Sequence, residues 1–235
     1  MRGQTMDLSI IDKISQESTR EYVYRFLKLN IMQLRMAPGS ALSEKDISKL
    51  LDVSRTPVRE AFIQLSHEYL LDILPQKGTY VSLIDIENVE ESKFLRETIE
   101  TAVIAIACVE FPSEKFFDLQ SNIVLQELCL KEKNFLKFYE LDEALHKIIF
   151  VGCKKARIWS MIQQMHTHYN RVRMLNISGG YDTLTVLNQH KQLVSAILEK
   201  DLALGMQTIG LHLNKVKFDI EDLRRDYAVY FKQDK

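Results

Sequence analysis

The chain has 235 residues, enough for two domains of ordinary size that each bury a core of their own. Its 31 basic and 32 acidic side chains give a formal net charge of −1, which excludes a protein coated with positive charge over its whole surface. No Cys-x-x-Cys pair, no N-terminus resembling a signal peptide and no apolar run longer than residues 102–109 predict a cytoplasmic protein without a membrane-spanning segment.

The N-terminal third predicts three helices followed by a β-hairpin. Residues 1–15 are polar and are expected to form a flexible tail, and the first helix after them should end at Pro38-Gly39. A second, short helix is expected behind Ser43, and a third behind Thr56 as N-cap residue with Pro57 at the first helical position. Two short β-prone runs then flank residues 75–78. Residues 16–83 are therefore expected to form a winged helix-turn-helix.

Two arginines, Arg55 and Arg59, lie four residues apart at the start of the third helix and off its apolar stripe. An isolated Arg-x-x-x-Arg pair is in most cases solvated charge on a helix surface. Here a turn, a helix start and a wing surround the pair, and arginine can donate two hydrogen bonds to O6 and N7 of guanine. The pattern favours a helix that enters a DNA groove, although residues 1–82 carry only 11 basic against 10 acidic side chains.

The C-terminal part shows no strand pattern, and its helical periodicity is interrupted at Pro112, at Gly152 and at a predicted loop over residues 178–180. After a linker at residues 84–88, residues 89–230 are expected to form an antiparallel, all-α bundle of six or seven helices. The expected helices span residues 88–109, 113–131, 133–151, 154–176, 182–199 and 201–228.

The N-terminal part resembles the DNA-binding domain of the GntR family of bacterial transcription regulators. The residues that carry the resemblance are Pro38-Gly39, Leu42-Ser43-Glu44, residues 53–61, 68–71 and 75–81. The resemblance implies contacts to bases and phosphates from the start of the third helix, a contact from the second helix, and a wing tip in the minor groove. The implied contact residues are Ser54, Arg55, Thr56 and Arg59, then Lys45, and then Lys77 with Gly78.

This sequence departs from the family pattern at two positions next to the third helix. Asp52 stands where the family usually has glycine in the turn, and Tyr69 stands where it usually has glycine after the helix. Either departure predicts strain or an altered cap, because a side chain makes the left-handed conformation more costly. Neither residue belongs to the predicted contacts.

Asp142 and His146 lie four residues apart and could chelate one ion, although most such pairs are ordinary surface pairs on a helix. With His190 and His212 they resemble the C-terminal domain of the FadR subfamily, the FCD type, in which one Asp and three His from three helices hold a divalent metal. The resemblance extends to Arg96, which is either the ion-pair partner of a neighbour such as Glu100 or the partner of an effector carboxylate. The expected metal is zinc first, with nickel, manganese or iron as alternatives.

Together the two resemblances imply a homodimeric, ligand-responsive regulator, expected to be a repressor, that binds a palindromic double-stranded DNA operator. Its effector would be a small carboxylate bound at the metal. One alternative is a metal sensor in which the ion itself is the effector. A metal-dependent hydrolase is a weaker alternative, because four protein ligands are more typical of a binding site than of catalytic zinc; we expect no enzymatic activity.

Overall fold

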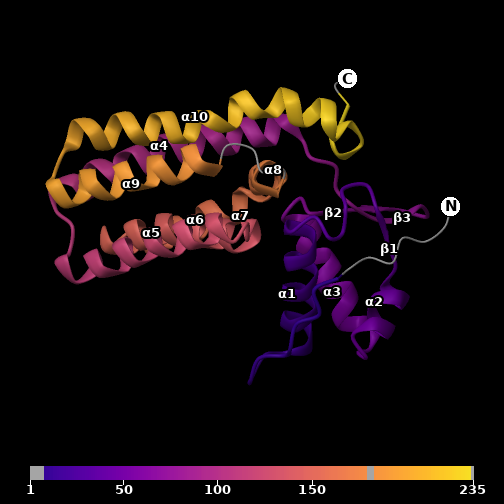
Figure 1. The fold of residues 1–235 in the computed structure, drawn as a ribbon. Helices are drawn as coiled ribbons and strands as arrows, with labels where there is room; N and C mark the ends of the chain where they lie inside the picture. The colour runs from indigo at the N-terminus through magenta and orange to yellow at the C-terminus, as the bar shows by residue number, and fades with distance from the viewer. Residues whose placement is uncertain (1–7, 179–182, 234–235) are drawn as a thin grey trace. The chain divides into compact units, whose positions relative to one another are not determined.

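The computed structural model describes residues 8–178 and 183–233, apart from the side chains of residues 177, 178 and 215–219. The chain divides into two compact units, one containing the residues up to Ile86 together with those from Arg224 onward, the other formed by Glu87–Leu223. Helices dominate both, and the sheet in the described part has three strands, which confirms the predicted mainly α class (Figure 1).

The first unit is a winged helix-turn-helix. Its elements are α1 (Thr19–Met32), β1 (Ala41–Leu42), α2 (Glu44–Leu50), α3 (Arg55–His67), β2 (Leu71–Leu74) and β3 (Gly78–Val81). The antiparallel hairpin of β2 and β3 is the predicted wing, with Leu71 opposite Val81 and Leu74 opposite Gly78. β1 pairs with the other edge of β3. This strand was not predicted, because two residues cannot display a period.

Helix α3 begins two residues earlier than the sequence predicts. Its N-cap residue is Ser54, whose backbone is extended, so that Thr56 and Pro57 are already helical. The prediction of Thr56 as N-cap residue was therefore wrong. Pro57 is nevertheless compatible with this position, because the first-turn N–H groups of a helix have no partner within it. The Ser54 side chain makes no capping hydrogen bond.

The two residues that replace the usual glycines both adopt the left-handed conformation, with φ of 51° at Asp52 and 57° at Tyr69. Hydrogen bonds hold each turn: the Ser48 hydroxyl donates to the carbonyl of Val53 at 2.6 Å, and the Ser82 hydroxyl donates to the carbonyl of Tyr69 at 2.5 Å. Both turns thus adopt a glycine-like backbone geometry at the cost of strain at two non-glycine residues.

Segments from both ends of the chain join the first unit. The backbone of Ser9 exchanges two hydrogen bonds with the Asn30 side chain, at 2.8 and 3.1 Å. Near the other end, Ile84 donates to the carbonyl of Tyr230 at 2.8 Å and accepts from Lys232 at 2.9 Å. The Phe231 side chain between them is 2% exposed. The stretch after the last helix therefore packs onto this unit.

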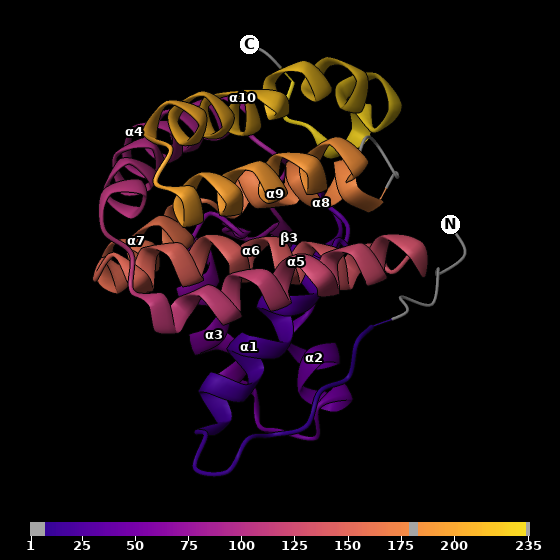
Figure 2. The same ribbon diagram turned by 60° about the vertical axis from the view of Figure 1, so that its left-hand side comes forward.

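The second unit is a bundle to which seven α-helices of the described chain contribute. These are α4 (Ile86–Val109), α5 (Phe116–Lys131) after the short 3-10 helix η1 (Ser113–Lys115), α6 (Phe135–Gly152), α7 (Ala156–Met165), α8 (Thr167–Ser178), α9 (Thr183–Glu199) and α10 (Leu202–Asp226). Figures 1 and 2 show α4, α9 and α10 along one side and the α5–α6 pair along the other. A second 3-10 helix, η2 (Ala228–Tyr230), follows α10.

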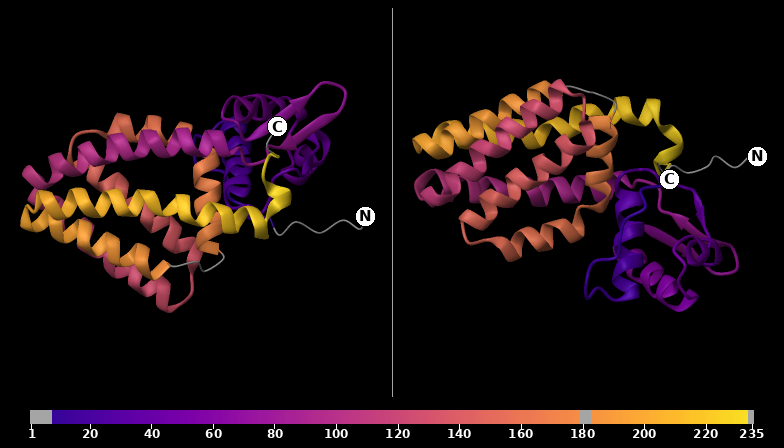
Figure 3. Two further views of the ribbon diagram at one scale, coloured as in Figure 1. Left: turned by 90° about the horizontal axis from the view of Figure 1, so that it is seen from above. Right: turned by 60° about the horizontal axis from the view of Figure 1, so that its bottom comes forward.

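The helix predicted over residues 154–176 is in fact two helices, because the chain bends at His166. The short α8 runs across one end of the long helices (Figure 3). All its residues up to Asn176 are buried, including polar ones for which no sequence pattern predicted burial. Of the predicted loop at residues 178–180, Ser178 ends α8, and Gly179 and Gly180 lie outside the described residues.

Burial of apolar side chains holds the helices of the bundle together. In the bundle, the buried faces of α4, α5, α6 and α9 meet in one apolar cluster that includes Ile104, Leu119, Leu145 and Leu193. None of the described helices is both long enough and apolar enough to cross a membrane. The apolar cluster surrounds the polar side chains that α6, α8, α9 and α10 bury inside the bundle.

Candidate metal centre and nucleic-acid interface

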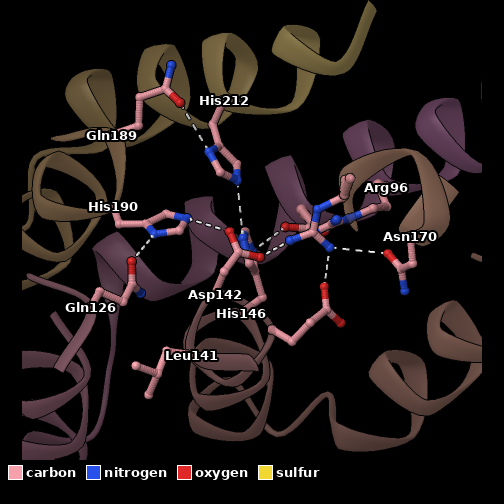
Figure 4. A network of polar contacts seen from close by, with 12 residues as sticks. Arg96, Gln126, Leu141, Asp142, His146, Asn170, Gln189, His190 and His212 are labelled. Carbon is pink, nitrogen blue, oxygen red and sulfur yellow. Dashed lines mark hydrogen bonds and ion pairs between the residues drawn. The ribbon is translucent and has the colours of Figure 1, made fainter. Parts of the chain in front are cut away.

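The four predicted metal ligands lie together inside the bundle (Figure 4). Asp142 and His146 come from α6, His190 from α9 and His212 from α10, and all four are buried. One potential ligand atom from each lies within 4.8 Å of the others. Four ligand atoms about 2.1 Å from one tetrahedral zinc ion lie about 3.4 Å from one another, so pairs as far apart as 4.8 Å would have to close in by about 1 Å to hold the ion.

Each imidazole has its Nδ1 atom against an oxygen that can only accept a hydrogen bond. The three contacts are His146 to Glu100 Oε2 at 2.7 Å, His190 to Gln126 Oε1 at 2.7 Å, and His212 to Gln189 Oε1 at 3.2 Å. Each Nδ1 must therefore carry the proton. A neutral ring with its proton on Nδ1 keeps a lone pair on Nε2, which is the form in which histidine binds a metal.

These lone pairs face one another and the Asp142 carboxylate. Nε2 of His146 lies 3.2 Å from Nε2 of His212. Nε2 of His190 lies 3.1 Å from Asp142 Oδ1, yet it has no hydrogen-bond partner. Four acceptor atoms that converge without a donor repel one another, and a divalent cation between them removes that repulsion. The residues present fit such an ion, and imidazole with carboxylate suits zinc, nickel, iron or manganese.

Burial keeps two of these imidazoles uncharged. It holds the pKa of His190 well below its ordinary value, and the positive charges of Arg173 and Arg96 act in the same direction. Burial likewise lowers the pKa of His212, and Arg96 and Arg173 contribute to this lowering. Burial alone would raise the pKa of Glu100, but the charge of Arg96 and the hydrogen bonds from His146 and Arg96 outweigh it and keep this carboxylate ionised.

A relay of amides fixes the orientation of His190. The Gln126 amide nitrogen donates to Asn122 Oδ1 at 2.7 Å, and the Asn122 amide nitrogen donates to the carbonyl of Leu141 at 3.0 Å. Gln126 must therefore present its oxygen to His190. The sequence analysis missed both amides. The sequence feature that could have identified them is the i, i+4 spacing of these two polar residues on the buried face of α5.

Two buried arginines lie beside the cluster. Arg96 makes a buried ion pair with Glu100, the more ordinary of its two predicted roles, while its Nη2 atom has no hydrogen-bond partner in the described part of the chain. Arg173 on α8 contacts the carboxylates of Asp142 and Glu143. Burial lowers the pKa of Arg173 to about 10, with Arg96 as the next cause. Sequence reasoning missed Arg173, because no local pattern marks it.

The predicted DNA-contacting residues are all exposed on the winged unit. Ser54, Arg55, Thr56 and Arg59 are at the start of α3, Lys45 is on α2, and Lys77 and Gly78 are at the tip of the hairpin. Gly78 has a φ of 117°, a conformation that a side chain would strain. Arg59 is held by Glu44, the first residue of α2, through two hydrogen bonds of 2.9 and 2.8 Å.

Comparisons with known proteins agree with both halves of this structure. Residues 19–81 match the family of bacterial regulatory proteins called gntR, and residues 93–215 match the FCD domain. The HTH-type transcriptional repressor RspR of Escherichia coli (strain K12) is 30% identical over 220 residues, which cover 93% of this chain and 96% of that protein. The gluconate operon transcriptional repressor of Bacillus subtilis (strain 168) is 26% identical over 216 residues, covering 89% and 88%.

Solved structures show the same fold. The structure of E. coli McbR/YncC covers 90% of this chain and all of that chain, with a TM-score of 0.75 at 18% identity. A putative regulator called GntR from Rhodococcus sp. RHA1 covers 92% of this chain with a TM-score of 0.68 at 20% identity. The chain therefore belongs to the GntR family, and it is a transcriptional regulator with a winged helix-turn-helix and an FCD domain.

Proposed function

We propose that this regulator is a homodimeric, cytoplasmic repressor whose bundle holds one divalent metal ion, zinc before nickel, manganese or iron, and binds a small carboxylate effector there. The observation that carries the proposal is the convergence of three Nε2 lone pairs and one Asp142 oxygen without a donor among them. Asp142, His146, His190 and His212 would be the ligands. The bound ion would supply a positive anchor for a carboxylate.

The surroundings of the cluster support an anionic effector. Arg96 offers an unused Nη2 donor, and Arg173 lies against the Asp142 carboxylate. Tyr169 lies beside Arg96, with the arginine 5.2 Å from the ring centre, and burial raises the pKa of Tyr169 to about 12, so that its hydroxyl stays protonated and can donate. Arginine pairs with carboxylates through two parallel hydrogen bonds, so Arg96 is the proposed contact to the effector.

The winged unit supports binding to a specific operator. Arg55 and Arg59 are the proposed base readers, helped by Ser54 and Thr56. Lys45, and Lys77 beside Gly78 at the wing tip, are proposed to bind phosphates. Two copies in a dimer with the bundle as dimerisation domain would require a palindromic operator. Two relatives whose names call them repressors favour repression over activation. A coupling free energy of about 1–3 kcal/mol between effector binding and DNA binding would suffice for regulation.

A thermal-shift measurement on metal-stripped protein tests the proposed site. Zinc should raise the unfolding temperature of the wild type by several degrees, and a panel of small mono- and dicarboxylates should raise it further only when zinc is present. His190→Gln should abolish both shifts, whereas His67→Gln, a change at an exposed histidine of the winged unit, should leave both unchanged. Equal shifts in wild type and His190→Gln would contradict the site.

The second candidate is a regulator in which the metal itself is the effector. One observation favours it: α10 carries the ligand His212 and continues into the segment that belongs to the winged unit. Titrating operator affinity with zinc in the absence of any organic acid separates the two candidates. A large change in affinity with zinc alone selects the metal sensor. No change leaves the ion as the anchor of the carboxylate effector.

A further inference from the structure

The ion pair between Glu44 and Arg59 joins the two helices of the helix-turn-helix. Glu44 is the first residue of α2 and Arg59 lies in the second turn of α3. The guanidinium Nε donates to Oε1 at 2.9 Å and Nη2 donates to Oε2 at 2.8 Å, the two-pronged arrangement that arginine makes with carboxylates. Solvent reaches both side chains, which are 65% exposed for Arg59 and 30% for Glu44.

The geometry of the pair leaves one edge of the guanidinium available. Arginine has five N–H donors, and Glu44 occupies the edge formed by Nε and Nη2. The outer edge, formed by Nη1 and the second hydrogen of Nη2, keeps its donors. Two donors on one edge are what a contact to O6 and N7 of guanine requires. Glu44 therefore restricts the arginine without removing its ability to read a base.

Because Glu44 holds the Arg59 side chain, Arg59 should lose less conformational entropy when it binds DNA. A free arginine side chain loses rotamer entropy when it binds, and a side chain already held in place loses less. The second consequence is electrostatic. The Glu44–Arg59 pair has no net charge, so its attraction for phosphates is weaker than that of a lone arginine. Arg55, one turn earlier, has no ion-pair partner among the residues that the structure describes.

We infer that Glu44 is a positioning residue that sets sequence specificity, by directing Arg59 to a base edge and keeping it away from the phosphate backbone. The inference rests on the proposed contact of Arg59 with DNA. It assigns the two arginines different tasks: Arg59 reads a base with little contribution to general DNA affinity, and Arg55 contributes to both. It also explains why an acidic residue is present on a surface that must approach a polyanion.

The test is Glu44→Gln, which keeps the size of the side chain and removes its charge. Duplexes are first selected by the wild-type protein from a random pool, and the base preference of each variant is then measured at every position. Glu44→Gln should lose its preference at one base pair per half-site, the same one that Arg59→Ala identifies. The ratio of specific to non-specific affinity should fall about 5- to 150-fold for each half-site, the range for one lost two-pronged base contact.

The salt dependence gives a second readout, which a merely structural role of Glu44 would not change. An Arg59 released to a phosphate should steepen the plot of log affinity against log salt for a non-specific duplex by about 0.9 per half-site. Glu60→Gln is the matched control, because it removes one charge from an exposed residue next to Arg59. It should leave base preference unchanged. Glu44→Asp should restore part of the preference.

The outcomes are distinguishable. If Glu44→Gln keeps the wild-type preference at the Arg59 position, or if Glu60→Gln loses it equally, the inference is wrong while the proposed DNA contact stands. If the wild type selects no sequence, or Arg59→Ala changes no preference, the proposed contact itself is wrong. Exposed ion pairs contribute little to stability, so unfolding temperatures of all variants should agree with that of the wild type.

Discussion

Replacing Gln126 by methionine should weaken metal binding although Gln126 is not a ligand. Methionine has a similar length but cannot accept the hydrogen bond from His190 Nδ1 or donate to Asn122 Oδ1. His190 could then carry its proton on either nitrogen and rotate about its side-chain bonds. Loss of such an orienting partner reduces metal affinity about 10- to 100-fold, which corresponds to about 1.4–2.7 kcal/mol.

The same change should also destabilise the metal-free protein. It leaves two buried polar groups without partners, each of which costs about 1–3 kcal/mol, so the free energy of unfolding should fall by about 2–6 kcal/mol. Gln126→Glu separates the two effects, because it keeps an acceptor for His190 and removes only the donor to Asn122. It should retain wild-type metal affinity or exceed it, despite a lower stability.

Zinc affinity is measured by competition with a chromophoric chelator, and stability by urea unfolding of the metal-free protein. Gln120→Met, an exposed change on the same helix, is the matched control and should affect neither. Wild-type zinc affinity in Gln126→Met would refute the orienting role. So would an equal loss in Gln126→Met and Gln126→Glu, because affinity would then follow stability rather than the acceptor.

Three further predictions concern other parts of the molecule. Arg55→Ala combined with Arg59→Ala should abolish operator-specific binding in a gel-shift assay without changing zinc affinity; retained specificity would contradict the role of α3. Burial, followed by the charge of Arg96, lowers the pKa of His166 to about 3. As pH falls from about 6.5 to 3, only the unfolded state gains this proton, so stability should decrease by up to about 1.4 kcal/mol per pH unit. In His166→Gln, urea unfolding should show a shallower slope, and an unchanged slope would contradict the neutral buried ring. Phe231→Ala should lower the unfolding free energy of the winged unit by about 3–5 kcal/mol, measurable by urea denaturation, if its burial beside Ile84 stabilises that unit.

The features that the sequence predicted well have local signals. The winged helix-turn-helix was predictable because its turns, helix starts and hairpin are each marked within a few residues. Even the left-handed conformations of Asp52 and Tyr69 could be expected, because those two residues stand at positions where the family usually has glycine. The helical periodicity of the bundle and the i, i+4 spacing of Asp142 and His146 are equally local.

The features that the sequence did not reveal depend on contacts between distant residues. The bend at His166 has no proline or glycine to mark it, and β1 exists only because β3 offers it an edge. Arg173 and Gln126 reach the cluster of Asp142 and the three histidines from α8 and α5, 31 and 64 residues away from their partners Asp142 and His190. Such contacts follow from tertiary packing, which no periodicity in a single sequence encodes.

Metal content per chain tests the central claim most directly. Wild-type protein and His212→Gln are saturated with zinc, dialysed against a weak chelator and analysed for zinc by elemental emission. A four-ligand centre at Asp142, His146, His190 and His212 predicts one zinc ion per wild-type chain and a much smaller fraction in the variant. No zinc in the wild type, or equal zinc in both proteins, would contradict a metal centre in the bundle.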